Sequence, residues 1–337
     1  MIELYYEDFE VGRRFDCGAK TLSEAEIVDF ARRFVPQPFH LDRAAGRASI
    51  LGDLSASGWH TCAAIMRMFV DAVILRASSM GSPGVSESRW LKPVFPDVEL
   101  RHVCEVTSAR LSASRPDAGF VGFRTTTTAG DAPVCMQEFV VMFGRRVPGE
   151  ATAAKRESGP KPAPAQPETP EILPGETMAH GSFDAVRLGP AYDLGGQEVT
   201  AEEIVAFARE FDPQPFHLDE AAGRASVFRG LAASGWHTTA LWVKHMTAAR
   251  KAAREAMPAE LRAAAEAAQG PSPGFEDLRW RRPVLAGDRL RFFSQPIEKR
   301  DLASRPDWGL LVSRNWAENQ RGEVAMSFTG KLLLRRG

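Results

Sequence analysis

Apolar and polar residues alternate along this chain with the period of helices in some stretches and of strands in others. Ser-x-x-Glu at Ser23 and Thr-x-x-Glu at Thr200 each predict a helix start, because such pairs cap each other's backbone amides. Each helix is expected to end at Phe34 or Phe211. The residue that follows precedes a proline, which disfavours its α conformation.

The rest of each half follows the same order of predicted elements. The segment PQPFHLD predicts an irregular loop, followed by a short helix over AAGRAS and a longer apolar helix that starts at SGWH. Strands are then predicted wherever Val, Phe, Thr and Met partly alternate with polar residues, over 85–94, 98–109, 119–128, 133–146, 275–284, 288–298, 308–317 and 323–335. One long helix against an antiparallel sheet, formed twice, is an α+β architecture.

The two halves are copies of one another. The segments FVPQPFHLDRAAGRAS (34–49) and FDPQPFHLDEAAGRAS (211–226) differ at only two positions, where Val35 corresponds to Asp212 and Arg43 to Glu220. Three further blocks match in the same order, SASGWHT with AASGWHT, SRWLKPV with LRWRRPV, and SASRPDAG with LASRPDWG. A period as long as a domain indicates a duplication rather than a solenoid.

The duplication defines the expected domain organisation. We predict a first repeat over 1–147, a linker over 148–170 and a second repeat over 171–337. The linker is rich in Pro, Ala and charge and has no apolar periodicity. The stretch 247–269 is rich in Ala, Arg and Glu and predicts an extra helix in the second repeat, as a solvated cover or an interface element.

Composition narrows the classes of function. The 337 residues are 44% hydrophobic and 25% charged, with a net charge of -1, so no overall field favours nucleic acid or an anionic membrane. We expect neither a signal peptide nor an apolar stretch long enough to span a bilayer, and a cytoplasmic location. The four cysteines, Cys17, Cys62, Cys104 and Cys135, lack metal-site spacing, so free thiols and no metal site are expected.

Candidate chemistry lies in the segment Asp212-Pro-Gln-Pro-Phe-His217. On a loop braced by prolines the carboxylate and the imidazole can converge, bind a water and exchange protons with it. Downstream, Ser234 is a favoured N-cap, and the glycine of Ser234-Gly235-Trp236 lets backbone approach a ligand at a helix start. A free amide there could stabilise a thioester enolate.

These residues resemble the MaoC-like dehydratases and (R)-specific enoyl-CoA hydratases of the hot-dog superfamily, in a duplicated, double hot-dog form. The resemblance rests on D-x-x-P-x-H followed by a small-Gly-aromatic helix start. It implies that Asp212 and His217 hold a catalytic water and that the Gly235 amide forms an oxyanion hole. The implied reaction is syn hydration of a trans-2-enoyl thioester, or its reverse. CoA is part of the substrate, and no other cofactor is needed.

The first repeat departs from this pattern, because Val35 stands where the second repeat has Asp212. His40 and Gly58 remain, but a lone imidazole lacks the partner that would fix the water. We therefore predict one working site, in the second repeat. The eukaryotic double hot-dog hydratases resemble this arrangement, with a silent first half that makes room for the substrate.

Several alternatives remain open at this point. Asp212 could simply terminate its helix, and His60 and His237 are expected to pack or hydrogen-bond. Ser234, Trp236 and Arg282 are candidate substrate-binding residues, with capping, core packing and solvation as their alternatives. A hot-dog thioesterase and a non-catalytic acyl-thioester binder compete with the hydratase. The substrate carrier is CoA or acyl carrier protein, and the repeats should form an intrachain pseudo-dimer, with a homo-oligomer also compatible.

Overall fold

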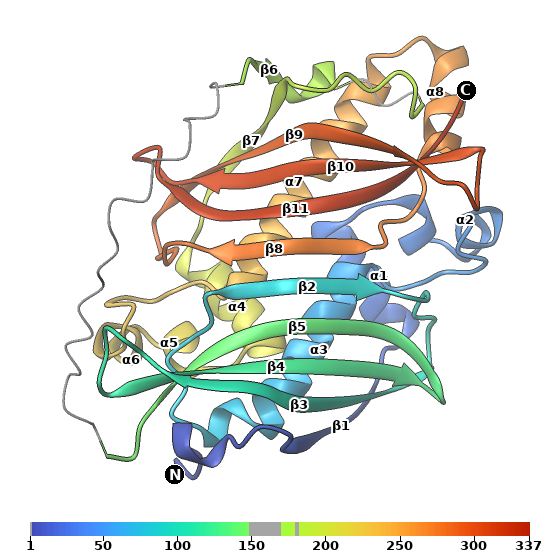
Figure 1. Cartoon of the computed structure of the whole chain (residues 1–337). Coiled ribbons are helices and arrows are strands. Elements are labelled where there is room, and N and C mark those ends of the chain that lie inside the picture. Colours follow the sequence, from blue (N-terminus) through green and yellow to red (C-terminus); the bar gives the residue numbers. More distant parts are fainter. Residues whose placement is uncertain (1, 148–169, 179–181) are drawn as a thin grey trace.

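The computed structural model describes residues 2–147, 170–178 and 182–337. Its strands form one sheet in the order β1-β3-β4-β5-β2-β8-β11-β10-β9-β7-β6 (Figure 1). The first repeat contributes β1 (Arg14–Thr21), β2 (Gly84–Trp90), β3 (Glu99–Leu111), β4 (Ala118–Ala129) and β5 (Ala132–Gly144). The second contributes β6 (Ile172–Pro174), β7 (Ala191–Glu198), β8 (Gly274–Trp280), β9 (Arg289–Asp301), β10 (Trp308–Glu318) and β11 (Val324–Arg335).

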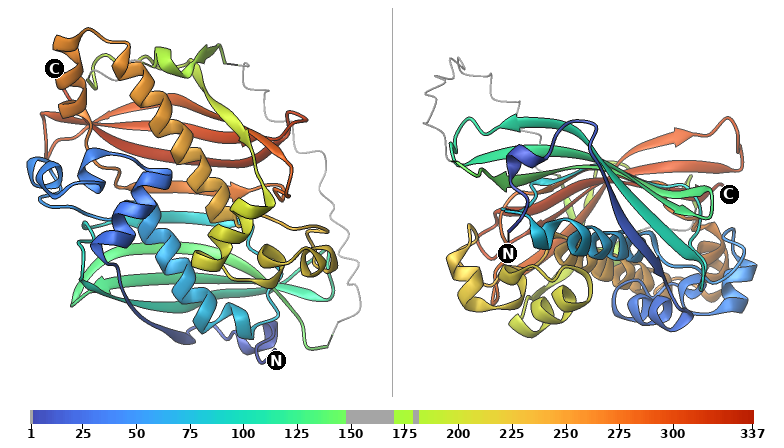
Figure 2. Two further views of the ribbon diagram at one scale, coloured as in Figure 1. Left: turned by 180° about the vertical axis from the view of Figure 1, so that it is seen from behind. Right: turned by 90° about the horizontal axis from the view of Figure 1, so that it is seen from below.

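The helices cover one face of this curved sheet (Figure 2). Two long helices, one from each repeat, run side by side across it, and the shorter helices flank them. The first repeat has α1 (Glu24–Phe34), α2 (Arg43–Ala48) and α3 (Gly58–Ala72). The second has α4 (Ala201–Phe211), α5 (Pro215–Leu218), α6 (Glu220–Ala225), α7 (Gly235–Glu255) and α8 (Ala259–Ala268). The predicted α+β architecture is therefore confirmed.

The two repeats join through antiparallel pairing of β2 with β8. In this register Glu87 faces Glu276 and Ser88 faces Phe275. Gly274 allows the close approach, because it has φ +138° and a Cβ there would lie 2.0 Å from the carbonyl oxygen of Ser88. Gly84 has the same relation to Leu278 across the pair. Glycine is thus required at both ends of the seam.

An apolar core shared by both repeats lies beneath the seam. Four phenylalanines from α1 and α4 interlock there, with Phe30 edge-on to Phe211 at 5.6 Å and Phe34 edge-on to Phe207 at 5.9 Å between ring centroids. All four are buried. Because each pair joins the two repeats, neither repeat has this core by itself.

Most predicted elements occur where the sequence places them. The capping boxes at Ser23 and Thr200 begin α1 and α4, and these helices end at Phe34 and Phe211. The expected irregular loop is wrong in part. A proline in the first turn nucleates a 3-10 turn over Pro38–His40 and the helix α5 in the second repeat.

The predicted strands missed β1, β6 and β7. β1 and β7 contain a break in their pairing next to a glycine with positive φ, Gly18 and Gly195, which interrupts the alternation of side chains. The extra helix predicted over 247–269 is the end of α7 and α8, separated near Pro258. The predicted linker, apart from Pro170, lies outside the described residues.

One expectation about membrane-length segments is wrong. The stretch Gly58–Arg76 has 19 residues with a mean hydropathy of 1.2, enough by length and composition to cross a bilayer. In the fold, 61% of that stretch is buried, and it forms the core helix α3 and the turn that follows. Its apolar character is explained by packing between the sheet and α7.

We predict that Gly274→Ala weakens the seam between the repeats. The added methyl group meets backbone rather than a movable side chain, so the free energy of unfolding should fall by more than about 3 kcal/mol. Gly287→Ala is the matched control. Gly287 also has a positive φ, +87°, but open space around it, and should cost only about 1–2 kcal/mol. Equal losses in chemical denaturation would contradict the steric role of Gly274.

Candidate active site

Asp212 and His217 converge at the end of α4. Asp212 is the C-cap of α4, with its backbone outside the helical region, and His217 lies in α5, one turn further on. The two side chains meet with 3.4 Å between His217 Nε2 and Asp212 Oδ2. They are 5% and 2% exposed, so the pair is withdrawn from bulk water.

Two neighbours hold the Asp212 carboxylate. The Ser234 hydroxyl donates to Oδ2 at 2.6 Å, and the Gln214 amide donates to Oδ1 at 2.8 Å. Burial alone would raise the pKa of Asp212, but the charge and hydrogen bond that His217 provides when it is protonated, with the bonds from Ser234 and Gln214, outweigh it. The pKa of Asp212 is therefore lowered, and the group is an ionised acceptor at neutral pH.

The orientation of His217 is fixed by backbone. Its Nδ1 lies 2.6 Å from the carbonyl oxygen of Ala232. A carbonyl only accepts, so Nδ1 carries the proton, and in the neutral ring Nε2 presents a lone pair. Nε2 and the carboxylate of Asp212 are then two acceptors facing one another. A water molecule can donate one hydrogen to each, and either group can take its proton.

Helix α7 begins beside this pair. Ser234 is its N-cap and Gly235 its first residue, so the Gly235 amide belongs to the first turn, whose amides have no partner within the helix. A Cβ on Gly235 would lie 2.3 Å from the Trp280 ring, so only glycine allows α7 to start against that ring. The positive end of the helix therefore faces the site.

A cavity of about 200 Å³ contains these groups. Asp212, His217, Ser234 and Gly235 line one part of it. The first repeat adds apolar side chains from α3, β2 and β5, namely Ile65, Met66, Phe69, Val85, Phe139 and Val141. The second repeat thus supplies the acid–imidazole pair, and both repeats supply the apolar wall around it.

The other predicted site residues have mixed outcomes. Trp236 lines the cavity but is buried and packs edge-on to Trp280 at 5.6 Å, so it serves the core as well. Arg282 also lines the cavity, on its exposed side, and pairs with Glu323 at 3.1 Å. An incoming phosphate would have to share or displace that carboxylate.

Two contacts from the first repeat were missed by the sequence reasoning. Ser79 donates to the side-chain oxygen of Gln214 at 3.2 Å and thereby orients the amide that holds Asp212. Arg67 on α3 donates to the carbonyl oxygens of Arg209 (2.9 Å) and Glu210 (3.2 Å), at the negative end of α4. No motif marks these residues, since their role depends on pairing across the repeats.

The first repeat contains a modified copy of the site. His40 Nδ1 lies 2.7 Å from the carbonyl oxygen of Ser55, as His217 lies from that of Ala232. Val35 is buried where the acid would be. Without a carboxylate, the Ser57 hydroxyl accepts only from the amide of His60, at 3.1 Å. The copy therefore keeps the imidazole and the helix start but lacks the second acceptor.

His60 and His237 are aromatic packing residues in the structure. His60 stacks on Phe30 at 4.4 Å and His237 on Phe207 at 4.8 Å between ring centroids. In both rings Nδ1 is buried without a hydrogen-bond partner among the described residues. Burial lowers the pKa of each to about 3, so both are neutral.

One cluster with metal-ligand chemistry was also missed. Cys17, His102 and Cys104 are buried, with their ligand atoms within 4.8 Å of one another, at the pairing of β1 with β3. His102 bonds to Thr127 at 2.9 Å through Nδ1 and to the Cys104 thiol at 3.3 Å through Nε2. These hydrogen bonds account for its burial. All four cysteines are free and buried, as expected of thiols.

This fold is a double hot-dog, two long helices packed on one continuous sheet that is antiparallel except for the pairing of β6 with β7. The model of the MaoC like domain matches residues 8–126 and 187–307, once in each repeat, and the chain belongs to that family. This family membership and the fold confirm the resemblance drawn from the sequence.

Two solved structures share this fold, and a curated protein is similar in sequence to part of the chain. A protein described as a MaoC domain dehydratase from Chloroflexus aurantiacus J-10-fl superposes with a TM-score of 0.75 at 17% identity, covering 99% of this chain and 97% of that one. A double-hotdog protein from Mycobacterium tuberculosis gives 0.70 at 17% identity, with 98% of both chains covered. The uncharacterised protein YdeM of Bacillus subtilis is 26% identical over 100 residues, 30% of this chain and 71% of YdeM.

The neutral buried histidines predict a loss of stability in acid. The pKa of His60 is about 3 in the folded chain and roughly 6.5 when unfolded, so the unfolded state binds more protons between these values. Stability is complete above about pH 6.5 and falls below it. His60→Phe should reduce the drop in unfolding free energy between pH 7 and 5 by about 2 kcal/mol.

Chemical denaturation at both pH values measures this drop. Trp59→Phe, at the adjacent position and without a titrating group, is the control and should keep the wild-type drop. A His60→Phe protein with an unchanged drop would show that His60 is already protonated in the fold.

Proposed function

We propose that the chain is a hydro-lyase that reversibly adds water to a trans-2-enoyl thioester and forms a 3-hydroxyacyl thioester. The observation that carries this proposal is the pair of acceptors, His217 Nε2 and Asp212 Oδ2, which face one another across 3.4 Å in a largely apolar cavity. A single water that donates a hydrogen bond to each is oriented and polarised for proton transfer.

The proposed hydration uses this water as both nucleophile and proton source. Its oxygen bonds to C3 of the enoyl group while one of its protons passes to the pair. Electron density moves through C2 to the thioester oxygen, where the Gly235 amide at the start of α7 stabilises the enolate. A proton from the pair then bonds to C2. Both new bonds form on the face toward the pair, which gives syn addition, and dehydration follows the same path in reverse.

The roles of the two groups follow from their surroundings. Asp212 remains ionised because Ser234 and Gln214 hold it, so it can balance the positive charge of a protonated His217. The backbone bond at Nδ1 keeps Nε2 directed at the reacting water in either protonation state. The acyl group would lie along the apolar wall from the first repeat, and the pantetheine of CoA or of acyl carrier protein would leave past the Arg282 side.

We predict that Asp212→Asn and His217→Ala each lower kcat for hydration of crotonyl-CoA by at least about 100-fold, because each removes one of the two acceptors. Loss of the ultraviolet absorbance of the conjugated enoyl thioester measures the rate. His40→Ala, the same substitution in the first repeat, is the matched control and should change kcat by less than about threefold, since Val35 leaves that imidazole without an acid.

Three outcomes would contradict the proposal. If Asp212→Asn retained activity, the carboxylate would be only a helix terminator. If the wild type released free thiol from a saturated acyl-CoA but left a panel of enoyl thioesters unchanged, the chain would be a thioesterase. A protein with neither activity would be a binder.

We predict that Phe139 limits the acyl chain. It lines the cavity from β5, within an aromatic cluster that includes Phe69 at 5.2 Å. Phe139→Ala should raise kcat/KM for dodecenoyl-CoA relative to crotonyl-CoA by about tenfold, as the wall recedes by several carbon atoms. Phe120→Ala, on β4 and outside the cavity lining, should leave the ratio unchanged. If the ratio were unchanged in Phe139→Ala, the acyl chain would not lie against Phe139.

A further inference from the structure

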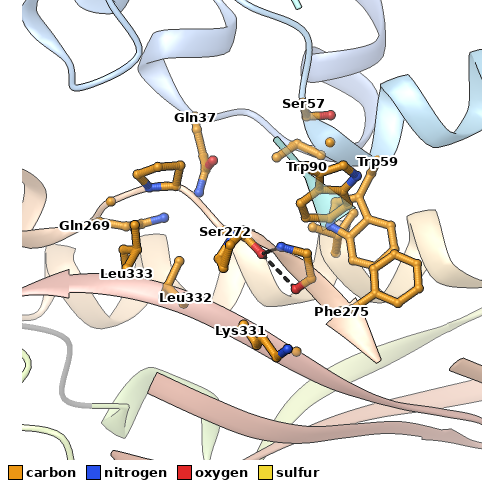
Figure 3. Close-up of a pocket in the computed structure, with 18 of the residues that line it drawn as sticks. Gln37, Ser57, Trp59, Trp90, Gln269, Ser272, Phe275, Lys331, Leu332 and Leu333 are labelled. Atoms are coloured by element: carbon orange, nitrogen blue, oxygen red, sulfur yellow. Dashed lines mark hydrogen bonds between the residues drawn. The ribbon is translucent and has the colours of Figure 1, made fainter. Parts of the chain in front are cut away.

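A second cavity, of about 410 Å³, lies where the first repeat has its copy of the site. It is about twice the volume of the catalytic cavity and falls within the usual range for a site that holds a drug-sized molecule. Figure 3 shows Gln37, Ser57 and Trp59 of the first repeat on one side, and Gln269, Leu332 and Leu333 of the second on the other. As in the catalytic cavity, both repeats form the wall.

The wall of this cavity differs from that of the catalytic cavity at equivalent positions. Strand pairing sets Val85 opposite Phe139 in the first repeat and Phe275 opposite Gly330 in the second, so the phenyl ring stands on the neighbouring strand. The matched SGWHT blocks place Met246 of α7 where α3 has Phe69. The result is a largely apolar chamber whose aromatic side includes Trp59 stacked on Phe275 at 5.0 Å.

The same correspondence sets Arg250 of α7 where α3 has Val73. Arg250 lines the second cavity and is partly buried, and its Nε is buried without a hydrogen-bond partner. No carboxylate among the described residues pairs with it, and the charge of Arg254 opposes its own. Burial lowers the pKa of Arg250 to about 10, so the group remains cationic at neutral pH.

A cation in such a place is costly by itself. Removing a charge from water without a counter-ion is unfavourable by several kcal/mol, and folded proteins normally pair such groups. Of the other Lys and Arg side chains that line the cavity, Lys331, labelled in Figure 3, is paired with Glu276, and Lys92 and Arg305 are exposed. Arg250 therefore stands out as a guanidinium with an unfilled requirement for an anion, and it adjoins a largely apolar chamber.

We propose that this cavity is a second, non-catalytic binding site for a long-chain carboxylate, whose carboxyl group pairs with Arg250 and whose hydrocarbon chain fills the chamber beside Trp59 and Phe275. A planar guanidinium can form two parallel hydrogen bonds with a carboxylate. A carboxylate thereby supplies the missing counter-charge, and the alkyl chain buries apolar surface in the chamber.

This site holds its ligand without transforming it. Val35 occupies the position of the acid, and the Ser57 hydroxyl is engaged with the His60 amide. Since a water at His40 has only one acceptor, the paired activation described for Asp212 and His217 is missing here. A carboxylate on an alkyl chain occurs both in a free fatty acid and at the far end of a dicarboxylic acyl thioester, and both share the chemistry that Arg250 recognises.

The test is ligand binding to the Asp212→Asn protein, so that turnover plays no part. Calorimetry should show one molecule of dodecanoate bound per chain, with a matching rise in Tm, and much weaker binding of dodecanol. Arg250→Met should weaken dodecanoate binding by at least about tenfold. Lys251→Met, the same change of charge at the next position of α7, is the control and should bind normally, because Lys251 is exposed and paired with Glu255.

Two readouts separate this proposal from a structural role and from the proposed reaction. Arg250→Met should be at least as stable as its parent, since it loses an unpaired charge. When Asp212 is intact, the Arg250→Met protein should hydrate crotonyl-CoA at the wild-type rate. The Asp212→Asn protein could bind dodecanedioyl-CoA in a way that depends on Arg250 and fail to bind dodecanoate. That result would assign the site to dicarboxylic thioesters. Dodecanoate and dodecanol binding equally, or Arg250→Met binding both carboxylates normally, would overturn the proposal.

Discussion

The pairing of β2 with β8 is the constraint on which the rest of the structure depends. It joins five strands of one repeat to those of the other and brings α3 and α7 side by side on one face. Each cavity is then lined by polar groups of one repeat and by the long helix of the other. Backbone hydrogen bonds at this seam therefore build the sites, although no residue of β2 or β8 is proposed to take part in the reaction.

Duplication gave the chain two such cavities, and a few positions made them different. In the first repeat Val35 stands at the position of the acid, so the Ser57 hydroxyl serves only as a helix cap. In the second repeat Ser234 both caps α7 and holds Asp212. The second cavity has Phe275 and Gly330 where the first has Val85 and Phe139, and Arg250 brings a charge into it. The repeats keep one backbone because the four interlocked phenylalanines and the seam glycines are the same in both.

Charge and burial are balanced in opposite ways at the two cavities. At the Asp212–His217 pair, a buried carboxylate is held by a hydroxyl, an amide and an imidazole, so its ionised form is stabilised without outside help. At the second cavity, a guanidinium adjoins apolar side chains without a protein counter-ion. The Asp212–His217 pair is therefore suited to binding a neutral water, and Arg250 is suited to binding an anion. This contrast follows from the general cost of leaving a charge unpaired away from solvent.

The sequence by itself determined the duplication, the helices of each repeat and the Asp212–His217 pair, because these depend on local rules. A capping box, a proline after a helix and a repeated motif act within a few residues. It did not determine β1 and β7, where bulges break the alternation, or the turns over PFH, where prolines start helical geometry. Only the tertiary structure decided that Ser79 and Arg67 support the second repeat's site and that Arg250 lies beside a cavity. Those contacts join residues more than a hundred positions apart, and neither spacing nor periodicity within the chain encodes such distances.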